Sequence, residues 1–202
     1  MTRSVFRFFS RQSGAVDLTS DRHQLRMPRA GDYRAWAELR GQSREFLQPW
    51  EPKWRVDELS GSAFRARLNR YEQEYISGQS IALFLFDRED EQLLGGITIG
   101  LIRRGVAQSC MIGYWMGERH AGQGHMAGAL DLVIPYIFGP LELHRIEAAC
   151  IAENRRSVRL LEKAGFQHEG FLRDYLKING QWRDHLMFSL LASDKDRNQK
   201  TS

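Results

Sequence analysis

The sequence predicts a single α/β domain in which helices flank a mixed, mostly antiparallel, twisted sheet. The chain has 202 residues, of which 42% are hydrophobic, and this is enough for one buried core. Along the chain, apolar positions alternate between the two-residue period of strands and the wider period of helices. Near the end, two β-rich runs flank Asn179 and Gly180, a pair that strongly favours a hairpin turn. Alternating strands and helices with a closing hairpin indicate a layered α/β fold.

The first third of the chain predicts one strand and two helices. Residues 24–28 form a short strand, and Asp32 is expected to cap the helix that follows. A loop marked by proline and tryptophan, residues 46–54, separates this helix from the next. The side chains that recur at helical spacing are Tyr33, Trp36 and Leu39 on the first helix, and Phe64, Leu68, Tyr71 and Tyr75 on the second.

The middle of the chain predicts three strands and a helix. Residues 81–86 and 94–101 are β-rich runs joined by a polar turn, so we expect them to pair antiparallel. Residues 111–116 predict another strand. A helix over residues 125–138 then presents an apolar face made of Met126, Leu130, Val133 and Ile137.

The last third predicts a strand, a helix and the hairpin. These elements cover residues 144–151, residues 155–164 with a stop at Gly165, and residues 171–178 and 182–191. The prediction totals about seven strands and about four helices. We expect residues 1–20 to be an N-terminal extension, residues 21–192 the folded domain, and residues 193–202 a disordered tail.

The composition narrows the classes of function. Lys and Arg outnumber Asp and Glu by 29 to 25, which permits an anionic ligand without requiring one. The basic residues are scattered, so direct sequence-specific nucleic-acid recognition is not expected. The chain lacks an apolar run of about 18 residues, and its basic, aromatic start lacks the apolar core of a secretory signal. We therefore expect a cytoplasmic protein without a membrane segment. The two cysteines and six histidines have no ligand spacing, so no metal is expected.

The stretch GERHAGQG at 117–124 lies between a predicted strand and a predicted helix. The exposed N–H groups of a first helical turn and the positive end of the helix attract an anion. The missing Cβ atoms of Gly122 and Gly124 let phosphate oxygens approach the backbone closely. The arrangement predicts a phosphate-binding loop, and the alternative is a tight turn that binds nothing.

The loop differs from two common phosphate binders. A P-loop needs Lys followed by Ser or Thr after the glycines, and a dinucleotide fold places its glycine loop after an early strand. Instead, residues 119–124 resemble the Arg/Gln-x-x-Gly-x-Gly/Ala signature of the GNAT acyl-CoA acetyltransferases. Residues 152–166 resemble the GNAT helix that opens with Asn and closes with Gly-Phe. The two segments occur in the family's order.

Longer segments resemble one branch of that family. Residues 46–52, 144–148, 154–166 and 169–185 are similar to the Rim-type (RimJ/RimL-like) enzymes, which acetylate the N-terminal alanine of ribosomal proteins, and the similarity covers residues 24–192. The resemblance implies a GNAT fold with a splayed central pair of parallel strands. It also implies an enzyme that moves acetyl from acetyl-CoA to the N-terminal α-amine of an alanine- or serine-starting ribosomal protein.

Two other functions stay open. One is acetylation of a small amine such as an amino acid, a polyamine or an antibiotic. The other is a low-turnover, CoA-binding regulatory or ribosome-associated module. The oligomeric state, monomer or homodimer, also stays open.

The resemblance implies a set of CoA-binding residues. The strand at 111–116 supplies N–H donors to the thioester carbonyl, and pantetheine lies between it and the strand at 144–151. The implied residues are Tyr114, Trp115, Met116, Arg119, His120, Ala121, Gly122, Gln123, Gly124, His125, Met126, Asn154 and Ser157.

Proton transfer to the leaving thiolate departs from the common GNAT pattern. Many family members carry a tyrosine where this chain has Leu161. Rim-type relatives have a serine one turn earlier, which here is Ser157, and this serine is their proposed proton donor. Helix capping is the alternative role for both Ser157 and Asn154.

The general base is less evident, because Met111 stands where other branches have a glutamate. Glu147 and Glu153 are the nearest candidates, although both suit a solvated or structural role as well. A site without a strong base favours an α-amine, whose pKa is about 8, over a lysine at about 10.4.

The acceptor is expected to bind near residues 46–54. Trp50 and Trp54 are predicted to wall a peptide groove, with Glu51 attracting the cationic amine. Alternatively, the two tryptophans hold the proline loop on the core.

Overall fold

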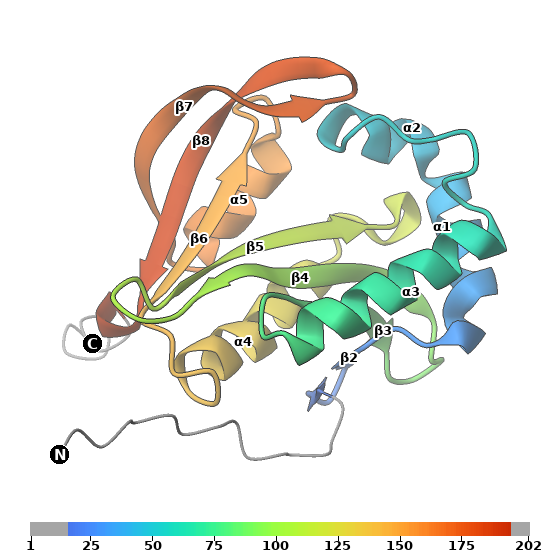
Figure 1. Cartoon of the computed structure of the whole chain (residues 1–202), viewed down its shortest axis with the longest axis horizontal. Coiled ribbons are helices and arrows are strands. Elements are labelled where there is room, and N and C mark those ends of the chain that lie inside the picture. Colours follow the sequence, from blue (N-terminus) through green and yellow to red (C-terminus); the bar gives the residue numbers. More distant parts are fainter. Residues whose placement is uncertain (1–15, 195–202) are drawn as a thin grey trace, which may run out of the picture.

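The computed structural model describes residues 16–194 and contains one eight-stranded sheet (Figure 1). In chain order the elements are β1 (Asp17–Thr19), β2 (His23–Arg26), η1 (Ala30–Asp32), α1 (Tyr33–Gln42), α2 (Arg44–Leu47), η2 (Gln48–Trp50), α3 (Gly61–Ile76), β3 (Ile81–Asp87), β4 (Leu93–Arg103), β5 (Ser109–Met116), η3 (Glu118–His120), α4 (His125–Phe138), β6 (Arg145–Cys150), α5 (Arg155–Lys163), β7 (Gln167–Ile178) and β8 (Gln181–Leu191). The predicted α/β class is confirmed, with one more strand than expected.

The additional strand is β1, which begins inside the predicted N-terminal extension and pairs with β2. Most of the predicted extension and the predicted tail lie outside the described residues, so the domain limits stay predictions. Within residues 16–194, no helix is long and apolar enough to cross a membrane.

The sheet has the order β1-β2-β3-β4-β5-β6-β8-β7 and is antiparallel except between β5 and β6. That parallel pair is short: Ser109 faces Arg145, and Met111 is the last β5 residue with a partner, Glu147. Beyond Met111, β5 continues to Met116 and β6 to Cys150 without pairing with each other, although each stays paired with its other neighbour. The predicted splayed central pair is therefore confirmed, and its unpaired backbone groups face a gap in the middle of the sheet.

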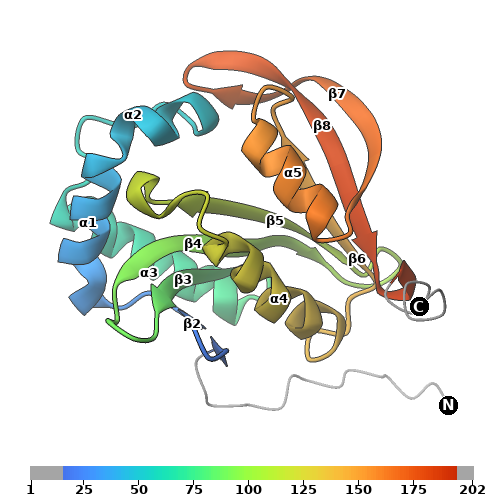
Figure 2. The same ribbon diagram turned by 180° about the vertical axis from the view of Figure 1, so that it is seen from behind.

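Helices cover the two faces of the sheet unequally. Figure 1 shows α3 on one face, and Figure 2 shows α4 and α5 on the other. The larger core lies against α4 and α5 and includes Leu83, Ile97, Ile112, Leu130, Ile146 and Leu161. A smaller aromatic cluster lies under α1 and α3 and contains Trp36, Leu39, Phe64, Phe84, Phe86 and Leu93. On this face α3 packs on β3 and α1 packs on β4.

The hairpin and the loop before α3 connect the two halves of the chain. Asn179 and Gly180 adopt positive φ angles of 45° and 85° at the turn between β7 and β8, as the Asn-Gly pair predicts. The backbone N–H of Asn179 donates to the carbonyl of Glu51 at 2.9 Å. The guanidinium of Arg156 on α5 lies 5.1 Å from the ring centre of Phe46 on α2. These contacts frame the gap between β5 and β6.

Two local predictions need correction. Asp32 precedes α1, but its side chain does not cap that helix. Both its carboxylate oxygens bind the guanidinium of Arg26, at 2.7 and 2.8 Å, and it also accepts from the backbone N–H of Arg29. An ion pair thus replaces the expected cap. The segment predicted as an open loop, residues 46–54, contains the end of α2 and the 3₁₀ turn η2.

Candidate active site

The glycine loop has the geometry expected of an anion-binding site. Gly122 and Gly124 have φ angles of 79° and 83°, a region that residues with a side chain rarely adopt. A Cβ atom added to either glycine would meet no protein atom within 4 Å, so the space beside them is open. Helix α4 begins directly after Gly124, at His125. The unpaired N–H groups of its first turn therefore lie beside a glycine surface that can accept phosphate oxygens.

Three buried histidines lie beneath this loop. The Nε2 atom of His23 lies 3.1 Å from Nδ1 of His125, and Nε2 of His125 lies 3.3 Å from the guanidinium of Arg22. An arginine can only donate, so Nε2 of His125 accepts and its Nδ1 donates to His23. Arg119 likewise donates to Nε2 of His120 at 2.9 Å. Burial is the largest cause that lowers the pKa of all three imidazoles.

His23 belongs to this cluster although its sequence position gave no indication of it. The position of the His23 ring explains why α4 has a glycine at position 128, which is not part of the predicted loop motif. A Cβ atom on Gly128 would lie 2.6 Å from the His23 ring, so only glycine fits at that position of α4. Hydrogen bonds to neighbouring side chains fix the rings of His120 and His125, two of the predicted CoA-binding residues.

Ser157 is buried on the face of the sheet that α5 covers. Its hydroxyl lies 2.6 Å from the phenol oxygen of Tyr114 on β5, and its backbone N–H donates to the side chain of Asn154 at 3.2 Å. Asn154 is thus the cap of α5, as its alternative role predicted, and Ser157 is not. Leu161, where many family members have a tyrosine, is fully buried in the core.

The phenol next to Ser157 comes from Tyr114 on β5, and not from a tyrosine on α5 as in many family members. Burial raises the pKa of Tyr114, and the hydrogen bond with Ser157 partly opposes that shift. Burial also raises the pKa of the Cys150 thiol to about 11, again opposed by a hydrogen bond with Ser157. The Ser157 hydroxyl therefore sits between a neutral phenol and a neutral thiol. Sequence reasoning placed Tyr114 among the CoA-binding residues but missed this pairing.

The two predicted general bases are both engaged in ion pairs. Glu147 on β6 accepts from Arg103 and from Arg145, and its side chain is 18% exposed. Glu153, in the turn before α5, is 67% exposed and accepts from Arg183 at 2.9 Å. The structure places neither carboxylate free beside the gap between β5 and β6.

The predicted acceptor residues divide into two groups. Trp54 is buried and donates from Nε1 to Glu51 at 2.8 Å, while Glu51 binds the buried Arg40 at 2.5 Å. The Arg40 guanidinium in turn lies 5.0 Å from the ring centre of Trp115. Trp54 and Glu51 therefore hold the loop on the core. Trp50 is 36% exposed and remains available to a ligand.

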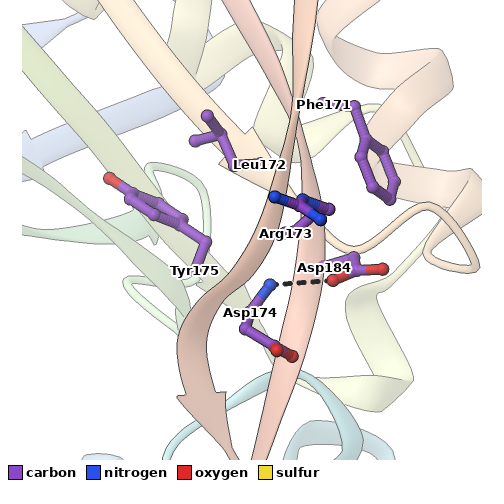
Figure 3. Close-up of a pocket in the computed structure, with 6 residues that line it drawn as sticks. All are labelled: Phe171, Leu172, Arg173, Asp174, Tyr175 and Asp184. Carbon is purple, nitrogen blue, oxygen red and sulfur yellow. Dashed lines mark hydrogen bonds between the residues drawn. The ribbon is translucent and has the colours of Figure 1, made fainter.

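A hollow opens where β7 and β8 lose regular pairing. Leu172 pairs with His185 and Leu176 pairs with Arg183, which leaves three β7 residues opposite the single residue Asp184. The backbone N–H of Asp174 donates to Asp184 at 2.8 Å. Figure 3 shows the side chains that line this hollow, with Leu172 and Tyr175 on one side of the hairpin and Phe171 on the other.

Comparison with known proteins identifies the same family throughout. The model of the acetyltransferase (GNAT) domain matches residues 22–167. The chain is 35% identical over 179 residues to the ribosomal protein uS5-alanine N-acetyltransferase of Escherichia coli (strain K12), covering 89% of this chain and 92% of that protein.

Two solved structures agree with this result. The ribosomal-protein-S5-alanine acetyltransferase of Vibrio fischeri superposes with a TM-score of 0.81 at 28% identity, covering 89% of this chain and 98% of that one. RimJ of Mycobacterium smegmatis, solved in complex with CoA-disulfide, gives 0.82 at 30% identity and covers 89% and 88%.

Proposed function

The chain belongs to the GNAT family of N-acetyltransferases, and from this premise we propose that it transfers acetyl from acetyl-CoA to the N-terminal α-amine of a ribosomal protein. The observation that carries the proposal is the gap between β5 and β6, open beyond Met111 and adjoined by the glycine loop. Free backbone groups at the gap can pair with the pantetheine chain, much as a peptide adds to a sheet edge.

The cosubstrate binds through backbone and side-chain groups on the α4–α5 side. The predicted donor range, residues 119–126, narrows to residues 122–126, because the N–H groups of His120 and Ala121 already donate to backbone carbonyls. The N–H groups of residues 122–126 hold the pyrophosphate, and the two glycines of the loop leave room for its oxygens.

The N–H groups of a strand point alternately to its two edges, and the N–H of Gly117 donates to the β4 side. The N–H groups of Tyr114 and Met116 therefore face the gap and can donate to the thioester carbonyl, whereas that of Trp115 faces β4. Such donors stabilise the oxyanion that forms when the amine attacks. That RimJ of Mycobacterium smegmatis was solved with a CoA species supports this site.

Ser157 and Tyr114 serve the departing thiolate. Ser157 on α5 is buried beside Cys150, which is on β6 at the edge of the gap. When the Tyr114 phenol donates to the serine oxygen, the serine proton is free to point at the CoA sulfur. A CoA thiolate leaves readily, since an ordinary thiol has a pKa of about 8.5, so a weak donor is sufficient.

The acceptor is an N-terminal amine rather than a lysine. At pH 7, deprotonating an α-amine with a pKa of about 8 costs about 1.4 kcal/mol, whereas a lysine near 10.4 costs about 4.6 kcal/mol. The two carboxylates predicted as bases, Glu147 and Glu153, are ion-paired, which favours the acceptor that is easier to deprotonate. The names of the relatives in Escherichia coli and Vibrio fischeri support an alanine-starting ribosomal protein. The reaction is then cytoplasmic.

The test is release of CoA thiol from acetyl-CoA in the presence of a peptide that begins with alanine. We expect turnover with the free peptide and none with the same peptide blocked at its N-terminus. Turnover with small amines alone would instead favour a small-molecule acetyltransferase. A rise in melting temperature with acetyl-CoA, but no thiol release with any amine, would favour a CoA-binding module.

A further inference from the structure

His185 on β8 is a buried histidine to which the proposed reaction has so far given no role. Its side chain is among the least exposed polar groups of the described chain, at 3%. The Nδ1 atom lies 2.8 Å from the carbonyl oxygen of Arg183. A carbonyl oxygen can only accept, so Nδ1 carries the ring proton, and in the neutral ring Nε2 presents its lone pair.

The Nε2 atom of His185 is available to a ligand. No group within residues 16–194 hydrogen-bonds to it, and the only buried side-chain nitrogen or oxygen without a partner in that part of the chain is Nε of Arg40. Nε2 therefore keeps some contact with solvent, although the residue as a whole is only 3% exposed. Tyr175 holds the ring in place, with the two ring centres 5.6 Å apart and the planes at 74°.

The sheet register places His185 on β8, separated from the gap by β6, and on the face of the sheet away from α4 and α5. Leu186 opposes Cys150 on β6, so His185 lies one residue beyond the end of that strand. Cys150 and Leu186 pack on the α4–α5 side, and alternation along β8 turns His185 to the opposite face. Leu172, the partner of His185 on β7, points with Tyr175 to the side of the hairpin away from Phe171 (Figure 3).

The sheet lies between the groups that serve the thiolate and the imidazole of His185. Ser157, Tyr114 and Cys150 gather on the α5 side, where the thiolate departs. His185 lies on the opposite face of the sheet, and the proposed role needs the amine to approach from that face. Glu147 shares that face, but its oxygens are occupied by Arg103 and Arg145. Of His185 and Glu147, only the imidazole is not engaged by a cation.

We propose that His185 is the base that takes a proton from the acceptor amine, a role that rests on the proposed acetyl transfer. An ammonium nitrogen carries three protons and the product amide nitrogen carries one. As the N–C bond forms and the C–S bond breaks, one released proton ends on the CoA sulfur. Nε2 of His185 takes the other and passes it to solvent. The Arg183 carbonyl accepts from Nδ1–H throughout and stabilises the imidazolium that forms.

The test is His185→Asn, whose side-chain amide can still donate to the Arg183 carbonyl but cannot act as a base. For an alanine-starting peptide we expect kcat/KM at pH 7 to fall by about 10²–10⁴-fold. The loss should shrink as the pH rises above about 8, where the amine is already deprotonated. Added imidazole should restore part of the rate. His168→Asn is the matched control, because His168 is an exposed histidine of β7 that packs on Phe188, and it should keep full activity.

Several results would overturn the role of His185. One is a folded His185→Asn variant with wild-type kcat/KM at pH 7. Another is a loss of equal size at every pH without rescue by imidazole, because that pattern indicates a structural role. If the variant does not fold, ¹⁵N NMR of the histidines in the wild-type protein decides instead. It should show the Nδ1–H tautomer, and an Nε2–H tautomer would exclude His185 as the base. A wild-type protein inactive on every amine would contradict the proposed function itself.

Discussion

The phenol oxygen of Tyr114 lies 2.6 Å from the hydroxyl oxygen of Ser157. The two residues come from β5 and α5, on either side of the gap between β5 and β6. In the proposed reaction, the pair brings a phenol to the side where the sulfur departs, although the helix carries Leu161 where many family members have a tyrosine. The phenol then orients the serine proton rather than giving up its own, since burial raises the pKa of Tyr114.

Replacing each member of this pair should lower kcat and leave acetyl-CoA affinity almost unchanged. We expect at least a tenfold loss for Ser157→Ala, because the thiolate loses its donor. Tyr114→Phe should lose about three- to tenfold, the equivalent of one hydrogen bond. In the Ser157→Ala background, Tyr114→Phe should have no further effect on steady-state kinetics. Additive losses would show that Tyr114 acts independently of Ser157, and an active Ser157→Ala variant would leave water as the proton source.

Gly124→Val should weaken acetyl-CoA binding, because a branched side chain at φ 83° fills the open space beside the loop. The matched control is Gly78→Val, which has a similar φ of 69° and equally open surroundings at the end of α3, far along the chain from the loop. Both variants should lose stability through backbone strain. Isothermal titration should show weakened binding only for Gly124→Val. Normal affinity in a folded Gly124→Val protein would mean that the pyrophosphate binds elsewhere.

Acidification should destabilise the fold through the histidines under the loop. Burial lowers the pKa values of His23, His120 and His125 from the ordinary 6.5, so below that pH the unfolded chain binds more protons than the folded one. Stability is therefore fully present above pH 6.5 and declines as the pH falls toward the lowered values.

Melting temperatures between about pH 5 and pH 8 check this prediction. His23→Gln should flatten the pH dependence, because the amide oxygen can still accept from His125 without taking up a proton. His168→Asn should keep the slope of the wild-type protein. A melting temperature that is flat or rises on acidification would contradict the linkage.

Substitutions at two positions of the loop before α3 should have different main effects, one on stability and the other on binding of the acceptor peptide. Glu51→Gln should lower the free energy of unfolding by up to about 3 kcal/mol, because the buried Arg40 loses its counter-charge. Trp50→Ala should raise KM for the peptide through its exposed edge, and should lower the free energy of unfolding by about 1–2 kcal/mol through the part of the ring that is buried. Denaturant unfolding and peptide kinetics measure the two effects. A Trp50→Ala variant with unchanged KM would remove Trp50 from the acceptor site.

The parts of the site encoded by neighbouring residues could be predicted from the sequence. The conformation of the glycine loop depends on φ angles that Gly122 and Gly124 allow, and the cap of α5 depends on Asn154 three residues before Ser157. Both signals lie within a few positions of one another. Asp32 is the exception among local signals, because Arg26 binds the carboxylate that would otherwise cap α1.

Contacts between residues that are far apart in the sequence could not be predicted from short sequence patterns. Tyr114 and Ser157 meet across the parallel crossover, and His23 reaches His125 because β2 and the start of α4 come together. Neither pairing has a spacing in the sequence that would reveal it. The tautomer of His185 likewise depends on the position of a backbone carbonyl in β8, which only the folded strand defines.

The site of acetylation on a peptide tests the central claim most directly. The substrate is a peptide that begins with alanine and contains one internal lysine, and tandem mass spectrometry locates the acetyl group after incubation with acetyl-CoA. We predict that the acetyl group is found on the N-terminal nitrogen. Acetylation of the lysine alone, or no acetylation of any alanine- or serine-starting peptide, would contradict N-terminal acetyl transfer by this protein.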